Sequence, residues 1–344
     1  MKDIRLGYYV ITVAAIVIVL AGIKSASAII VPFLFSLFIA IILSPSYGFL
    51  QKKGLPSGVA LVVVIFSFMI FLAAIATLIG NSLQSFSANI DNYTQQLSAY
   101  YISLAQITQN LGIDMPAEEF SNFVNPKQIM IFVSSMLKGM GSVFTNGFVI
   151  LLTVVFMLLE TKSFNHKIDM LDNNKETKEH IQKIVTKIKE YMTLKAIISL
   201  FTGLIVWIAL FIIGTDYAFL WAVLAFLLNF IPNIGSMIAA IPAVLITLVQ
   251  LGSASALLVG GLYIAINMII GSVIEPRVMG KGLGLSTLVV FLSLLFWGWL
   301  LGMVGMLLSI PLTIIIKIIL YENKNTRWVS ILLDSANSLE TKVK

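Results

Sequence analysis

Residues 217–251 read YAFLWAVLAFLLNFIPNIGSMIAAIPAVLITLVQL, an uncharged apolar stretch broken once, at residues 232–236. About 20 apolar residues suffice to cross a bilayer as a helix, so the stretch is long enough to enter lipid on both sides of the break. Backbone polar groups in lipid must be paired, so a non-helical break persists there only where protein buries it or where it lines a cavity. The stretch therefore predicts a broken helical pair in a membrane protein.

A second interrupted apolar segment, residues 287–320, resembles the first. Residues 240–246 (AIPAVLI) align with residues 309–315 (SIPLTII), and a glycine lies beside the same register in each segment, Gly235 and Gly305. A weak repeat of broken apolar segments points to the solute site of a transporter. We therefore predict a solute pathway at these breaks. The alternative is a pair of kinked structural helices, since proline and glycine are common in membrane spans.

The composition of the whole chain agrees with a membrane protein. The 344 residues are 59% hydrophobic and 11% charged, with a mean hydropathy of +0.99. Soluble domains carry about 25% charged residues. The absence of cysteine excludes disulfides and thiolate chemistry, and the two histidines lack a metal-ligand spacing. No P-loop or Ser/His/Asp grouping is present, so we predict no enzyme, cofactor or metal.

The apolar runs predict an all-α membrane protein with about eight membrane-inserted helical units. The six predicted full spans are Tyr8–Ile23, Ala26–Leu43, Val59–Ile79, Val143–Leu159, Ala196–Ile213 and Ala254–Ile274. The two interrupted segments, 217–251 and 287–320, are predicted to be re-entrant hairpins of opposite orientation. This arrangement places every cluster of lysine and arginine on the cytoplasmic side, together with both termini. If each interrupted segment crossed once instead, Arg277 and Lys281 would face outward.

This layout divides the chain into six parts. The parts are N-terminal membrane helices over 1–80, an extracytoplasmic helical segment over 81–142, the fourth span over 143–160, a cytoplasmic amphipathic helix over 161–195, a transport core over 196–320 and a cytoplasmic tail over 321–344. The lysine-rich amphipathic helix is interleaved with acidic residues, so its charge indicates a membrane surface or partner helices and not nucleic acid.

The extracytoplasmic segment begins with a heptad pattern. Apolar residues recur at spacings of three and four, which is typical of a coiled-coil seam. Its predicted contact residues are Leu83, Phe86, Ile90, Tyr93, Leu97, Tyr100 and Leu104. Two interpretations remain open: a helix that packs on its own protomer, and a contact between protomers outside the membrane.

Polar and glycine residues near the breaks are the candidate site. The predicted substrate pathway consists of Asn229, Pro232, Asn233, Gly235, Ser236, Asn267 and Ser272. The predicted coupling or gating residues are Glu275, Arg277, Gly302 and Gly305. The amides and hydroxyls suit a polar neutral or weakly anionic solute, and ionisable residues near membrane depth are functional candidates. A mutual ion pair between Glu275 and Arg277 is the structural alternative.

Three motifs carry a family resemblance. They are NFIPNIGS at 229–236, EPRVMGKGLGLS at 275–286 and FWGWLLG at 296–302. On these residues the chain resembles the autoinducer-2 exporter family, especially the branch named for export of the quorum-sensing signal. The resemblance implies a secondary transporter that exports autoinducer-2 across the bacterial inner membrane, and a homo-oligomer of five chains. It also implies an alternative, sodium(lithium)/proton antiport, since members of the family are described in that way. A non-transporting membrane scaffold is the third interpretation.

Overall fold

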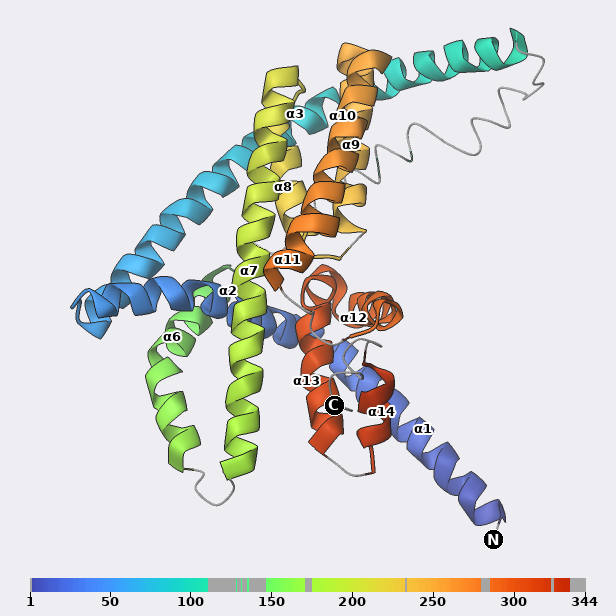
Figure 1. The fold of residues 1–344 in the computed structure, drawn as a ribbon. Coiled ribbons are helices and arrows are strands. Elements are labelled where there is room, and N and C mark those ends of the chain that lie inside the picture. The colour runs from blue at the N-terminus through green and yellow to red at the C-terminus, as the bar shows by residue number, and fades with distance from the viewer. Residues whose placement is uncertain are drawn as a thin grey trace. The chain divides into compact units, whose positions relative to one another are not determined.

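The structure, a computed structural model, is helical over the residues that it describes (Figure 1). These are residues 2–110, 147–170, 175–232, 234–279, 285–322 and 325–334, with 128, 131 and 135. The sole β feature in these ranges is an isolated antiparallel bridge between Leu285 and Asp334. Helices satisfy their own backbone hydrogen bonds, as lipid requires.

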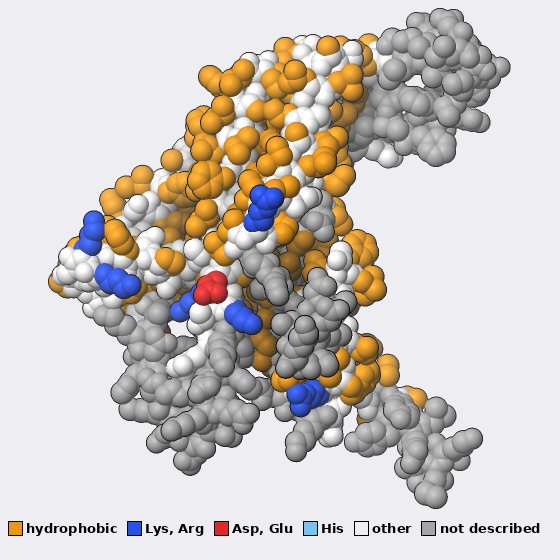
Figure 2. Space-filling model, in the orientation of Figure 1, with side chains coloured by type: hydrophobic (Ala, Val, Ile, Leu, Met, Phe, Trp, Pro, Cys, Tyr) orange, Lys and Arg blue, Asp and Glu red, His pale blue; other side chains and the backbone are white. Residues whose placement is uncertain are grey.

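Five described helices are long and apolar enough to cross a membrane. They are Ser27–Lys52, Ser57–Tyr100, Val185–Ile213, Ser253–Val278 and Thr287–Leu307. Shorter apolar helices are Val10–Ser25, Gly147–Glu160, Ala218–Leu228, Gly235–Leu251 and Ser309–Tyr321. Large apolar side chains are exposed along many of them, and Figure 2 shows hydrophobic side chains covering much of the described surface with few charges between them. The prediction of an all-α, multi-pass membrane protein is confirmed.

The chain forms two compact units. One contains Met1–Ile65, Asn146–Leu194 and Met279–Lys344, and the other contains Phe66–Thr145 and Lys195–Val278. The two interrupted segments of the sequence therefore belong to different units.

The unit that holds both termini contains α1 (Lys2–Ser25), α2 (Ser27–Lys52), α6 (Gly147–Met170), α12 (Thr287–Leu307), α13 (Ser309–Glu322) and α14 (Arg327–Leu332). Helix α2 packs on α6, and α13 packs on both α12 and α14. The buried hydroxyl of Ser36 lies 2.7 Å from the carbonyl oxygen of Pro32 and 3.2 Å from that of Ile150, which ties α2 to α6. An ion pair between Lys317 and Asp334 holds the segment after α14 against α13.

The other unit is built around α8 (Ala218–Leu228), α9 (Gly235–Leu251) and α10 (Ser253–Asn267), with α9 packed against both neighbours. The chain continues from α10 into a π-helical segment, η1 (Met268–Ile274), and then into α11 (Glu275–Met279). Helix α7 (Lys175–Ile213) approaches α8 so closely that a Cβ on Gly203 would lie 3.1 Å from the carbonyl oxygen of Ala222.

Several helices continue beyond the predicted spans because polar composition does not by itself end a helix. Helix α3 (Ser57–Asn110) joins the predicted third span to the heptad segment, and α7 joins the predicted amphipathic helix to the fifth span. Helix α2 runs to Lys52, beyond the predicted end of the second span at Leu43. Neither α3 nor α7 contains proline, and the lysine, glutamate and glutamine residues in α7 are good helix formers.

The heptad seam of α3 packs within its own chain over most of the described length. Phe86, Tyr93 and Leu97 are buried. The ring of Phe86 lies 5.9 Å from that of Trp221, edge to face, and the hydroxyl of Tyr93 donates to Asp216 at 3.1 Å. Packing on the chain's own α8 is one of the two interpretations that the sequence left open. An additional contact between protomers stays a prediction.

Candidate solute-binding site

The first break lies between the end of α8 and the start of α9. Asn229 is buried there, directly after α8. A Cβ on Gly235 would lie 1.7 Å from the carbonyl oxygen of Leu228, so only glycine allows the chain to turn back this tightly. Pro232 falls inside the break, and its carbonyl accepts from the Ile234 amide at 2.7 Å. Asn233 lies outside the described residues.

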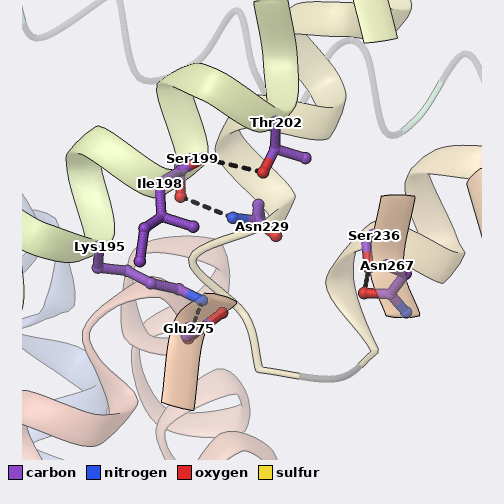
Figure 3. Close-up of polar contacts among 8 residues, drawn as sticks. All are labelled: Lys195, Ile198, Ser199, Thr202, Asn229, Ser236, Asn267 and Glu275. Carbon is purple, nitrogen blue, oxygen red and sulfur yellow. Dashed lines mark hydrogen bonds and ion pairs between the residues drawn. The ribbon is translucent and has the colours of Figure 1, made fainter. Parts of the chain in front are cut away.

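A polar stripe on α7 faces this break. Lys195, Ser199 and Thr202 are spaced i, i+4 and i+7, which places them on one side of the helix. All three are buried, and the remainder of α7 after Thr202 is apolar. The side-chain amide of Asn229 donates to the Ser199 hydroxyl at 3.0 Å (Figure 3). The stripe and the break therefore form one polar patch inside apolar helices.

An ion pair between Lys195 and Glu275 lies beside this patch. The Lys195 ammonium nitrogen is 2.6 Å from Glu275 Oε1, and the two side chains are 2% and 21% exposed (Figure 3). A buried charge without a partner is costly, so this contact accounts for a lysine in so apolar a setting. The ion-pair partner of Glu275 is thus Lys195, and the predicted alternative of a mutual Glu275–Arg277 pair was wrong. Arg277 is exposed.

Asn267 and Glu275 flank the π-helical segment η1. The Glu275 amide donates to the Ile270 carbonyl, five residues back, which is the π-helical register. At the other end, the Ser236 hydroxyl donates to Asn267 Oδ1 at 2.7 Å and so connects α9 to the start of η1 (Figure 3). Ser272 lies on η1 and is exposed. Single π-turns inside helices are frequent at functional sites.

The second break lies in the other unit, where Ser309 and Thr313 are buried on α13. Gly302 adopts φ 67° and ψ −149°, a conformation that disfavours any other residue. A Cβ on Gly305 would lie 2.0 Å from the carbonyl oxygen of Trp297, so the chain turns back on itself here too. The Trp297 indole donates to the Thr313 hydroxyl at 3.0 Å. The two glycines predicted to take part in gating thus shape a turn.

Comparison with known proteins identifies the chain. The model of the family described as AI-2E family transporter matches residues 10–324. The chain belongs to the AI-2E transporter family. The "AI-2 transport protein TqsA" of Escherichia coli K12 is 39% identical over 329 residues, which cover 95% of this chain and 96% of the relative. A "Putative transport protein" of Haemophilus influenzae is 42% identical over 340 residues, 96% of this chain and 97% of the relative.

A more distant relative also matches over most of both chains. The "Putative transport protein YrrI" of Bacillus subtilis is 23% identical over 306 residues, 85% of this chain and 86% of the relative. The family assignment makes the chain a membrane transporter and not an enzyme, as the sequence predicted. Among the described residues, no group of three histidine, aspartate or glutamate side chains is placed to hold a metal ion.

In this AI-2E transporter, one unit contains four predicted site residues, Asn229, Ser236, Asn267 and Glu275. Each is bonded to a side chain on another segment. The sequence reasoning missed the α7 partners Lys195 and Ser199, and also Thr202, whose buried hydroxyl donates to the Ile198 carbonyl of its own helix. The signal for them was their helical spacing, but it crossed a predicted boundary: Ser199 and Thr202 lie in the predicted span Ala196–Ile213, and Lys195 was the last residue of the predicted amphipathic helix.

Proposed function

We propose that this chain is a secondary transporter that exports autoinducer-2, a small polar signalling molecule, across the bacterial inner membrane. The observation that carries the proposal is the buried polar patch at the α8–α9 break, where Asn229 meets Ser199 among apolar helices. Burying polar groups among apolar helices costs free energy unless the groups form hydrogen bonds with the protein or with a solute. The relative named for AI-2 transport supports the choice of solute.

The patch has hydrogen-bonding capacity to offer a solute. A side-chain amide has two N–H donors and an acceptor oxygen. The contact of Asn229 with Ser199 uses one donor, and the contact of Asn267 with Ser236 uses the acceptor. A solute with several hydroxyl or carbonyl oxygens can exchange with these side-chain contacts, so that the polar groups stay paired as it enters and leaves.

Sodium(lithium)/proton antiport is the second candidate, and Glu275 is the residue on which it rests. In the structure this carboxylate already accepts from Lys195 at 2.6 Å. A sodium ion would have to share the carboxylate with a buried ammonium, which repels it. A pH-gradient dye assay in vesicles decides the matter. Sodium-dependent dequenching that is lost in Glu275→Gln would favour antiport.

The membrane arrangement is part of the proposal. We infer that α8–α9 and α12–α13 are re-entrant hairpins of opposite orientation and that both termini are cytoplasmic. The chain has no native cysteine, so single cysteines can be introduced without background. Cysteines at Lys53 and Trp328 should react with an impermeant thiol reagent from the cytoplasmic side only. Labelling from the outer side would reverse the orientation.

Homo-oligomerisation, with five chains, is likewise proposed on the family resemblance. The α3 seam is a weaker support than the sequence suggested, because Phe86, Tyr93 and Leu97 are buried against their own chain. Mass measurement of the detergent-purified protein by light scattering tests the proposal. A strictly monomeric species in mild detergent would remove it.

The experiment that tests export is uptake of labelled autoinducer-2 into inside-out vesicles. We expect accumulation with the intact protein and a loss of at least tenfold with Asn229→Leu, which removes the amide but keeps the side-chain volume. Thr153→Val is a matched control, because the Thr153 hydroxyl donates only to the Val149 carbonyl of its own helix. No accumulation above empty vesicles, with folded protein present, would refute autoinducer-2 export.

A further inference from the structure

The two partners of the Lys195–Glu275 ion pair lie in different local settings. Lys195 is 1% exposed and lies within an uninterrupted α-helix, α7. The Glu275 side chain is 21% exposed and lies where the π-helical η1 passes into α11. Lys195 is therefore fixed by a regular α-helix, whereas Glu275 lies at a junction between π-helical and α-helical backbone.

A buried ammonium restricts what can replace its partner. An ammonium has three N–H donors, and Lys195 donates to Glu275 Oε1 at 2.6 Å. An ammonium in a protein interior needs a compensating negative charge. A neutral hydroxyl or amide cannot supply that charge. Any group that takes the place of Glu275 must be anionic.

The π-helical register supplies a way to move the carboxylate. The Glu275 amide bonds to the carbonyl five residues back, one residue more than in an α-helix. A return to the α-helical register would rotate the segment that follows by about 100°, the angle per residue of an α-helix. Such a rotation turns the Glu275 side chain away from α7 while Lys195 stays in place.

We propose that Lys195 is the solute-binding charge of the export site and that Glu275 is its exchangeable counter-ion, so that the site takes a small solute with a negatively charged group. This proposal rests on the proposed export function and names the chemistry of its solute. The anionic group of the solute pairs with Lys195 as Glu275 swings out. When the solute leaves, Glu275 pairs with Lys195 again. The empty protein can therefore return to its starting state without leaving the buried ammonium unpaired.

The Asn229–Ser199 contact fits this arrangement. Ser199 lies one helical turn beyond Lys195 on the same side of α7. A solute whose anionic group reaches Lys195 can therefore place a hydroxyl next to the Asn229–Ser199 pair. Charge would be recognised at one end of the solute and hydrogen bonding at the other.

The test is a competition experiment on purified full-length protein. Glu275→Gln removes the built-in competitor and keeps the shape of the side chain, so small anions should bind this variant at least tenfold more tightly than the unaltered protein. The probes are acetate, inorganic phosphate and labelled autoinducer-2, measured by titration calorimetry and thermal shift in detergent. Lys195→Met/Glu275→Gln should bind none of them. Lys53→Gln, which alters an exposed lysine elsewhere, should match the unaltered protein.

If the Lys195–Glu275 ion pair only stabilised the fold, removing Glu275 would not strengthen the binding of anions. Anion binding by Glu275→Gln that is no tighter than by the unaltered protein would overturn the proposal. If Glu275→Gln does not fold, the unaltered protein is compared with the double variant, and equal anion binding by the two overturns it. The proposed function fails separately: tight anion binding by Glu275→Gln, with no autoinducer-2 export in vesicles, keeps the anionic site and rejects that solute.

Discussion

Gly235→Ala tests the geometry of the first break directly. The added Cβ would lie 1.7 Å from the Leu228 carbonyl oxygen, 2.6 Å from its carbonyl carbon and 2.9 Å from the Cβ of Ile231. An ordinary van der Waals contact is about 3.5–4.0 Å, so the chain must open by well over 1 Å. Two of the three atoms are backbone and cannot move aside by changing rotamer. We therefore expect the full cost of overpacking, about 3 kcal/mol.

The intrinsic preference of the helix works against this cost. Alanine is favoured over glycine by about 1 kcal/mol in a helix interior, and Gly235 is the first residue of α9, so this value is the most that the preference can offset. The expected net loss is therefore about 2 kcal/mol or more. With roughly 2–4 °C lost per kcal/mol in a large domain, the melting temperature should fall by about 4–8 °C. Thermal unfolding in detergent, followed by size-exclusion chromatography after heating, measures the change.

Gly261→Ala provides the matched control for this substitution. Gly261 lies in α10, and a Cβ there would meet nothing within 4 Å. This variant should be as stable as the unaltered protein or slightly more stable, because only the helix preference changes. If Gly235→Ala and Gly261→Ala melted together, the close approach of the α9 start to the α8 carbonyl would be refuted.

Two further predictions concern contacts that the structure forms over long sequence separations. Glu275→Leu should lower the free energy of unfolding by about 3 kcal/mol, since it leaves Lys195 buried and unpaired. Lys195→Met/Glu275→Leu removes both charges and should be close to neutral. Equal losses in the single and double variants would show that the ion pair is not the source of the effect. Phe86→Ala and Trp221→Ala should each cost about 3–5 kcal/mol, because both rings are fully buried, and a double-mutant cycle should give a coupling of about 0.5–3 kcal/mol. Strict additivity in that cycle would mean that α3 does not pack on α8.

The breaks were predictable because their causes are local. Proline and glycine restrict or release the backbone of their own and adjacent residues, so Pro232, Gly235 and Gly302 mark the interruptions without any knowledge of the fold. The apolar runs are equally local signals, because the composition of consecutive residues decides whether a helix can lie in lipid. What these signals could not give is the depth of each helix or the number of residues that continue a helix beyond the lipid, as in α3 and α7.

The ion-pair partner of Glu275 was not predictable by the same means. Arg277 is two residues from Glu275 and was the obvious candidate, while Lys195 is 80 residues away. Tertiary packing, and not sequence distance, decides which cation is close. Lys195 also ends a lysine-rich segment, so its sequence context suggested a solvated residue. Only its helical spacing to Ser199 and Thr202 distinguished it.

The two breaks share a close approach of a glycine to a backbone carbonyl but differ in what surrounds it, and this difference favours the first as the proposed solute site. At both breaks a glycine allows the returning helix to approach a carbonyl of the preceding one, Leu228 in one case and Trp297 in the other. Close approach alone therefore explains the repeat in the sequence and implies no solute. At the first break, Asn229 bonds to α7, beside a buried ion pair. At the second, the Trp297 indole bonds to Thr313, a contact that closes the turn on itself. An anionic solute, as proposed above, needs charge compensation, and the buried ion pair beside the first break can supply it, which favours that break.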